Sequence, residues 1–143
     1  MPELPEAEHA RARIEGWLGG RTLTDARAID GLVVRDVGGR AMSPAAFRAA
    51  LVGARAVEVR RRGKRLVVDL EGGRALGLTL GMSGKPVLLE LGACDSLAEG
   101  ATLPAHVRWA IAAGTRAGAL VDLRRLSRAT VGDTADVERF LGL

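Results

Sequence analysis

The sequence predicts an α+β domain that is mainly β: an antiparallel β-sandwich with flanking helices, one at the N-terminus and a second, short one. Short runs of β-branched or alternating apolar residues recur at close intervals, with turn residues between them. Apolar residues at helical spacing are confined to a few segments. With 143 residues and 48% apolar content, the chain can form one domain with a core and is short for two.

The first helix is expected to begin almost at the N-terminus. Ala7, Ala10 and Ile14 recur at helical spacing, acidic residues crowd the first turn, and two glycines follow at 19–20 as a stop signal. A second helix is expected after Ser43-Pro44, because serine is a good N-cap and proline suits the first helical position.

Seven further segments have the pattern of strands. They are residues 21–29, 54–61, 66–70, 75–80, 86–91, 107–112 and 119–123. Each segment is short and is bounded by turns that contain Gly, Asp-Ser or Pro. Seven or eight strands at this spacing are typical of an antiparallel sandwich, here flanked by two or three helices.

Composition narrows the function only slightly. The net charge of +4 is compatible with a polyanionic partner but does not choose between nucleic acid and an anionic membrane. A single cysteine, Cys94, excludes an internal disulfide, and with only His9 and His106 besides it no metal site is expected. Because the sequence has no signal peptide and no apolar stretch of about 18 residues, we expect a cytoplasmic protein without a membrane anchor.

The N-terminal residues Pro2-Glu3-Leu4-Pro5-Glu6 can carry chemistry. Removal of Met1 would expose a secondary amine on Pro2, which can attack a sugar C1′ and form an iminium ion. Such an amine, with a pKa of about 7.7 to 8, is partly neutral at physiological pH. Glu3 and Glu6 could shuttle protons beside it. Proline and acidic residues also suit the start of any helix, so this segment alone does not distinguish a catalytic N-terminus from an ordinary helix start.

Two glycine turns follow that could contact DNA. In Arg61-Arg62-Gly63-Lys64, the lysine can reach a phosphodiester from a rigid tip, although such hairpins are often plain solvated loops. In Leu80-Gly81-Met82-Ser83-Gly84, a flexible apolar methionine could fill the space that a flipped nucleotide leaves. The alternative for this second turn is a β-turn with Met82 in the core.

The segment Asp122-Leu123-Arg124-Arg125-Leu126 offers cationic and apolar groups together. Taken in order, these four motifs resemble the N-terminal catalytic domain of the formamidopyrimidine-DNA glycosylase and endonuclease VIII family. They match its Pro-Glu-Leu-Pro-Glu start, Arg-Arg-Gly-Lys hairpin, Leu-Gly-Met-Ser-Gly loop and Asp-x-Arg-Arg-Phe segment. The resemblance covers essentially all 143 residues and implies a sandwich with a helix along each open side.

The resemblance implies a base-excision repair enzyme, a bifunctional DNA glycosylase and abasic-site lyase. Its substrates would be oxidised bases of the formamidopyrimidine or 8-oxoguanine type in double-stranded damaged DNA. The residues implied as catalytic are Pro2, Glu3, Glu6 and Lys64, and those implied as DNA-binding are Lys64, Met82, Arg124, Arg125 and Leu126. In these roles Pro2 is the nucleophile, Lys64 holds a phosphate, and Arg124 faces the opposite base.

The same resemblance implies a monomer without metal or small-molecule cofactor, associated with the nucleoid of a bacterial cytoplasm. The helix-two-turn-helix and zinc-finger domains of the family are expected to be absent, with residues 1–143 forming the catalytic sandwich alone. Thr79 and Leu126 replace the histidine and phenylalanine that are common in the family. The alternative is a non-catalytic damaged-DNA-binding domain, inactive because the C-terminal half is missing or Met1 is retained. A basic sandwich that binds RNA or protein would require all four matches to be accidental.

Overall fold

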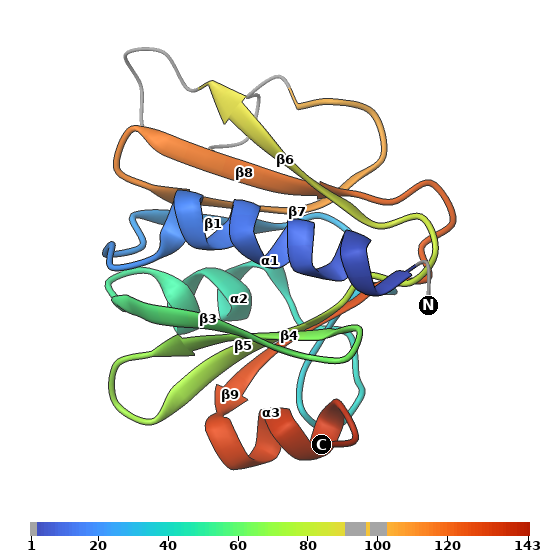
Figure 1. Cartoon of the computed structure of the whole chain (residues 1–143). Helices are drawn as coiled ribbons and strands as arrows, with labels where there is room; N and C mark the ends of the chain where they lie inside the picture. The colour runs from blue at the N-terminus through green and yellow to red at the C-terminus, as the bar shows by residue number, and fades with distance from the viewer. Residues whose placement is uncertain (1–2, 91–96, 98–102) are drawn as a thin grey trace.

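Two β-sheets packed face to face form the body of the domain (Figure 1). The computed structural model describes residues 3–90, 97 and 103–143. The elements in this part of the chain are α1 Glu3–Leu18, β1 Asp25–Ala28, β2 Val34–Arg35, α2 Pro44–Leu51, β3 Ala56–Arg62, β4 Arg65–Leu70, β5 Arg74–Thr79, β6 Lys85–Glu90, β7 Val107–Ala113, β8 Arg116–Val121, β9 Arg128–Asp133 and α3 Thr134–Phe140. One sheet has the order β1-β7-β8-β6 and the other β2-β9-β5-β4-β3. The predicted fold class is confirmed.

Helix α1 closes one open side of the sandwich. It runs between the two sheets and contacts β3 of one sheet and β6 and β8 of the other (Figure 1). The expected apolar face is buried, and Trp17 stacks on Trp109 with ring centroids 6.2 Å apart. Gly118 on β8 is required here, because a Cβ at this position would lie 2.6 Å from the Trp17 ring. The helix is therefore fixed closely against the core.

Helix α2 begins as the sequence predicts and packs against β1. Ser43 is the N-cap, and its hydroxyl accepts a hydrogen bond of 3.1 Å from the amide of Ala46. Phe47 and Leu51 are fully buried in the same core cluster as Trp17.

The strand predicted at residues 21–29 forms two separate pairings, and only Asp25–Ala28 belongs to one of the two sheets. Residues 21–23 exchange backbone hydrogen bonds with residues 54–56, while Asp25–Ala28 pairs with β7. A uniform strand pattern cannot reveal this division, because both halves alternate in the same way. The sequence also missed β2, β9 and α3, and the pairing of β2 with β9 is parallel, an exception to the antiparallel prediction.

Helix α3 covers the outer face of the five-stranded sheet (Figure 1). Its Val137 is buried with Leu141, Val67 and Ala75. Gly77 on β5 permits this contact, since a Cβ there would lie 2.5 Å from a Val137 methyl group. Among the helices of the described residues, none is sufficiently long and apolar to cross a membrane.

Candidate functional site

A cavity of about 680 Å³ opens beside the first turns of α1. Its walls come from α1, the β3–β4 hairpin, the β5–β6 loop and the start of β6. The lining residues are Pro5, Glu6, Ala7, His9, Ala10, Arg13, Lys64, Arg65, Thr79, Leu80, Gly81, Met82, Gly84, Lys85 and Pro86. Three motifs that lie far apart in the sequence therefore meet around one hollow.

The charge of this cavity is mainly positive. Arg13, Lys64, Arg65 and Lys85 line it, and among the described side chains of its wall Glu6 is the one carboxylate. Clustered cations in a concave surface attract a polyanion such as a phosphate backbone. The cavity thus combines an electropositive wall with apolar groups from the β5–β6 loop.

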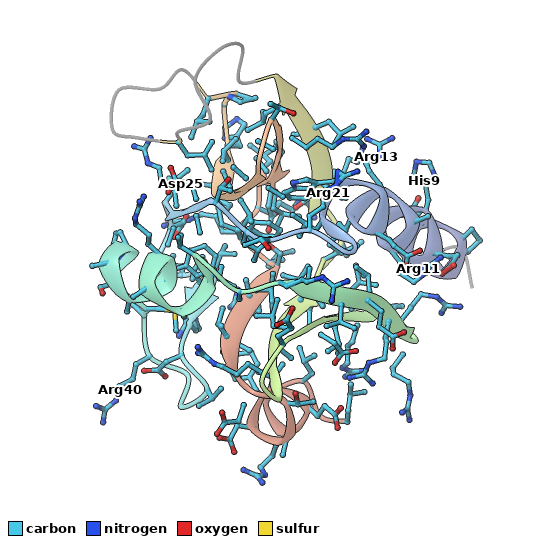
Figure 2. The ribbon with its side chains drawn as sticks, turned by 90° about the vertical axis from the view of Figure 1, so that its left-hand side faces the viewer. His9, Arg11, Arg13, Arg21, Asp25 and Arg40 are labelled. Carbon is cyan, nitrogen blue, oxygen red and sulfur yellow. The ribbon has the colours of Figure 1, made fainter. Side chains whose placement is uncertain are left out.

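Helix α1 supplies its wall residues from one face. Glu6, His9 and Arg13 are spaced three and four positions apart, so they share that face. Arg13 Nη1 donates to the carbonyl of Pro86 at 3.3 Å, and its Nη2 lies 3.2 Å from His9 Nε2. Figure 2 shows His9 and Arg13 on one side of α1 and Arg11 on the opposite side.

The β3–β4 hairpin is attached to α1 by an ion pair. Arg61 Nε donates to Glu8 Oε2 at 3.1 Å, and Glu8 also accepts a bond of 2.8 Å from Arg11. The hydrogen bond from Arg11 holds the pKa of Glu8 below its ordinary value; burial opposes this, and the hydrogen bond from Arg61 adds to the lowering. At the tip, Gly63 has a φ of 61°, a left-handed conformation that suits glycine. These contacts keep Lys64 at the cavity.

A buried carboxylate joins the β5–β6 loop to segment 122–127. Asp122 Oδ1 accepts a bond from the hydroxyl of Ser83, and its Oδ2 accepts bonds of 2.8 and 2.5 Å from the amide and hydroxyl of Ser127. Burial raises the pKa of Asp122, but these hydrogen bonds outweigh that effect and hold the pKa below its ordinary value. The two segments therefore form one unit.

Close backbone packing reinforces this unit. Gly81 has a φ of 63°, and a Cβ there would lie 3.0 Å from the carbonyl carbon of Leu126. Beside this contact, the side chain of Met82 is 81% exposed and that of Leu126 is 48% exposed. Such exposure of large apolar side chains contradicts the alternative that placed Met82 in the core, and it leaves both groups available to a partner.

The structure places Arg125 differently from its neighbours. Its guanidinium donates two hydrogen bonds to Asp30, at 2.7 and 3.2 Å, and Arg108 donates a third at 3.1 Å. Arg124 and Arg125 are both exposed, and the amide of Arg124 donates to the Ser83 hydroxyl at 3.4 Å. The predicted DNA contact of Arg125 would require this ion pair to open, and it stays a prediction.

The other predicted residues lie as follows. Glu6, Lys64 and Met82 line the cavity, while Arg124 and Leu126 belong to the unit that carries Met82. Pro2 and the side chain of Glu3 lie outside the described residues, although α1 begins at Glu3. No group of three or more His, Cys, Asp or Glu side chains that could hold a metal ion occurs in the described part of the chain.

Sequence reasoning missed several residues of this region. Arg13 could have been found, since it follows Glu6 and His9 on one helical face. Lys85 directly follows the Leu80–Gly84 motif. No sequence pattern pointed to Asp30 as a partner of Arg125, because 95 positions separate the two residues in the chain.

The ionised form of Asp30 is expected to stabilise the fold. The hydrogen bond from Arg125 lowers its pKa; burial opposes this, and the Leu32 amide and the charge of Arg108 add to the lowering. A lowered folded-state pKa means that the contribution is complete above the unfolded value of about 3.9 and is lost as the pH falls through the folded value. The melting temperature of the parent chain should therefore exceed that of Asp30→Asn at pH 6, and the difference should shrink below about pH 4. A difference that is constant across this range would contradict the expectation.

The fold and the cavity define a β-sandwich domain with a cationic cavity between the start of a helix, the tip of a hairpin and the β5–β6 loop. The chain matches the family described as formamidopyrimidine-DNA glycosylase N-terminal domain over residues 1–129. The chain therefore belongs to the formamidopyrimidine-DNA glycosylase N-terminal domain family, which confirms the resemblance found in its motifs.

Curated relatives agree with this assignment. A formamidopyrimidine-DNA glycosylase of Nocardioides sp. is 46% identical over 85 residues, covering 59% of this chain and 28% of the relative. The protein of the same name from Thermobifida fusca is 40% identical over 85 residues, with the same shares. The chain thus spans under a third of the length of these relatives.

Solved structures share the fold. The Lactococcus lactis FPG (MutM) in a complex with FAPY-dG containing DNA superposes with a TM-score of 0.77 at 22% identity, covering 97% of this chain and 47% of that chain. A MutM in complex with carbocyclic 8-oxo-G containing DNA gives 0.76 at 21% identity, with the same coverage. The chain spans about half the length of these proteins.

Proposed function

We propose that this chain is the catalytic domain of a bacterial base-excision repair enzyme that removes oxidised bases and cleaves abasic sites in double-stranded DNA. Family membership supports the general class, since the curated relatives are named as DNA glycosylases. The observation that carries the proposal is the convergence of Glu6, Lys64 and Met82 on one cationic cavity beside the start of α1.

The proposed chemistry begins at Pro2 after removal of Met1. Its neutral secondary amine attacks C1′ of the flipped nucleotide, the bond to the base breaks, and the base departs with a proton. Glu3 protonates the sugar ring oxygen, and the ring opens to an iminium ion on the amine nitrogen. Loss of a C2′ proton then expels the 3′ phosphate by β-elimination, δ-elimination of the 5′ phosphate can follow on the same iminium ion, and water finally releases Pro2. No metal or cofactor takes part.

The remaining residues bind and position DNA in this proposal. Lys64 holds a backbone phosphate beside the lesion, as a point charge at a fixed hairpin tip can do. Met82 and Leu126 enter the stack where the nucleotide has left, which offsets part of the cost of unstacking. Arg124 donates to the edge of the opposite base. Glu6 orients the charge that develops near Pro2.

Borohydride trapping on a duplex with one abasic site tests the proposal. The Met-free chain is expected to form a covalent adduct, and a chain that retains Met1 is expected to lose it, because the nitrogen of Pro2 is then an amide without a nucleophilic lone pair. Glu3→Gln should slow adduct formation by about 10²- to 10⁴-fold, as the loss of a proton-transfer group does.

The matched control is Glu71→Gln, which makes the same chemical change in an exposed residue at the other end of β4. This variant should react like the parent chain. If Met-free protein forms no adduct, catalysis by this chain is refuted; selective binding of the abasic duplex without an adduct would then identify a damaged-DNA-binding domain.

A further inference from the structure

Segment 122–127 contains a backbone conformation that is unusual for its residue type. Arg125 has a φ of 58°, in the left-handed region that non-glycine residues seldom adopt. Among the described residues one other non-glycine, His106, has a positive φ, and its carbonyl accepts the amide of Asp122 at 3.0 Å. A positive φ at Arg125, and at His106 whose carbonyl binds Asp122, marks this segment as one that the surrounding structure holds in place.

Two carboxylates hold Arg125 in this conformation. Asp122 Oδ1 accepts the Arg125 amide at 3.1 Å, and Asp30 accepts the guanidinium through both oxygens. Asp30 is 7% exposed, and it is itself fixed by Arg108 and by the amide of Leu32 at 2.9 Å. Paired hydrogen bonds between a guanidinium and a carboxylate restrict orientation as well as distance.

The conformation of Arg125 affects the residues on either side of it. Arg124 and Leu126 are both exposed, whereas Asp122 and Ser127 at the ends of the segment are buried. If the guanidinium of Arg125 left Asp30, one of the two carboxylate contacts that hold its left-handed conformation would be lost, and only the bond from its amide to Asp122 would remain. Arg124 and Leu126 would then sample other directions before they met DNA.

We propose that Asp30 is a positioning residue for lesion recognition: it binds Arg125, and through Arg125 it presents Arg124 and Leu126 beside Met82. The inference rests on the proposed function, since those three residues are the ones assigned to the gap in the DNA. Asp30 itself does not touch DNA in this account. Its effect is to reduce the ordering that the segment must undergo when it binds.

A direct contact between Arg125 and a DNA phosphate makes the opposite prediction. In that case Asp30 would compete with DNA for the guanidinium, and Asp30→Asn would strengthen binding to every duplex. If Asp30 acts by positioning, Asp30→Asn weakens the preference for a damaged duplex instead. The sign of the change therefore distinguishes the two roles.

The experiment measures affinity for a duplex with one abasic site and for the same duplex undamaged, and reports their ratio. Asp30→Asn and Arg125→Ala are each expected to lower this ratio about tenfold, because a disordered segment must be ordered on binding. Arg125→Gly should lose less than Arg125→Ala, since glycine adopts a positive φ without strain. The control Asp136→Asn removes the same charge from a half-buried residue of α3 and should leave the ratio unchanged.

Amide hydrogen exchange at Arg125 and Ser127 accompanies the binding measurement and should accelerate in Asp30→Asn. A general loss of structure in Asp30→Asn would weaken binding to both duplexes equally, and the ratio measured for Arg125→Ala then decides. An unchanged ratio in Asp30→Asn and Arg125→Ala, or stronger binding to both duplexes, overturns the proposal. Because Arg125→Ala keeps the Asp30 contact with Arg108, it tests the proposal even where Asp30→Asn folds poorly.

The same measurements on the parent chain distinguish a failure of this inference from a failure of the proposed function. A parent chain that neither prefers the abasic duplex nor forms a Pro2-dependent adduct refutes the function, and the inference with it. A parent chain that does either, with variants whose ratio equals its own, refutes the inference alone.

Discussion

Replacing Trp17 with alanine is expected to lower the free energy of unfolding by about 3–5 kcal/mol, the usual cost of removing a large aromatic side chain from a core. Trp17 is 1% exposed, stacks on Trp109, and donates from Nε1 to the carbonyl of Ile111 at 3.2 Å. The space it leaves cannot collapse easily, because Gly118 beneath the ring has no side chain to fill it. Urea unfolding followed by far-ultraviolet circular dichroism measures the change.

Two further variants test whether the loss of stability comes from the packing of Trp17. Trp17→Phe keeps an aromatic ring against Trp109 and loses the hydrogen bond, so it should cost less than Trp17→Ala. Leu88→Ala removes an apolar side chain that is 62% exposed, and its effect should stay within about 0.5 kcal/mol. Equal losses in Trp17→Ala and Leu88→Ala would show that α1 does not pack as described.

Replacing Asp122 with alanine is expected to cost on the order of 3 kcal/mol, because buried donors that lose a charged acceptor are left without partners. Asp122 is fully buried and accepts hydrogen bonds from Ser83, from the Arg125 amide and from both donors of Ser127. The β5–β6 loop and segment 122–127 would then move independently. Thermal or urea unfolding measures the stability, and binding to an abasic duplex measures the effect on the site.

Two smaller changes test the same network one bond at a time. Ser83→Ala removes the bond between the loops, and Ser127→Ala removes one bond within the segment; each should cost about 1 kcal/mol. Under the proposed function, Ser83→Ala should weaken the preference for an abasic duplex more than Ser127→Ala does, because Ser83 is next to Met82 and bonds Asp122 across the two loops, whereas Ser127 bonds it within one segment. If Ser127→Ala weakened this preference more than Ser83→Ala, the bond from Ser83 to Asp122 would not contribute to recognition of the abasic duplex.

Local chemistry explains which parts of the fold could be predicted from the sequence. The start of α2 depends on Ser43 and Pro44 themselves, and the face of α1 depends on a repeat within a few turns. In these cases the residues that determine the structure are neighbours in the chain. The cavity was also foreseen in part, because the motifs of residues 61–64 and 80–84 match a known family.

Long-range contacts explain what could not be predicted. The strand β9 contains Gly132 and lacks a clear alternation, and its position depends on pairing with β5 and β2. The ion pair of Asp30 with Arg125 likewise joins residues from distant segments. An aspartate beside a turn is common in any sequence, so its burial against two arginines becomes visible only when the segments are placed together.

The stacked pair of Trp17 and Trp109 has a spectroscopic consequence. The chain contains these two tryptophans and no tyrosine, so its intrinsic fluorescence excited at 295 nm arises from one buried site between α1 and β7. Near-ultraviolet dichroism of the coupled rings likewise reports the docking of α1, the helix that begins at the candidate catalytic end. A change in this emission when DNA is added would signal movement of α1 itself, since neither indole ring lines the cavity.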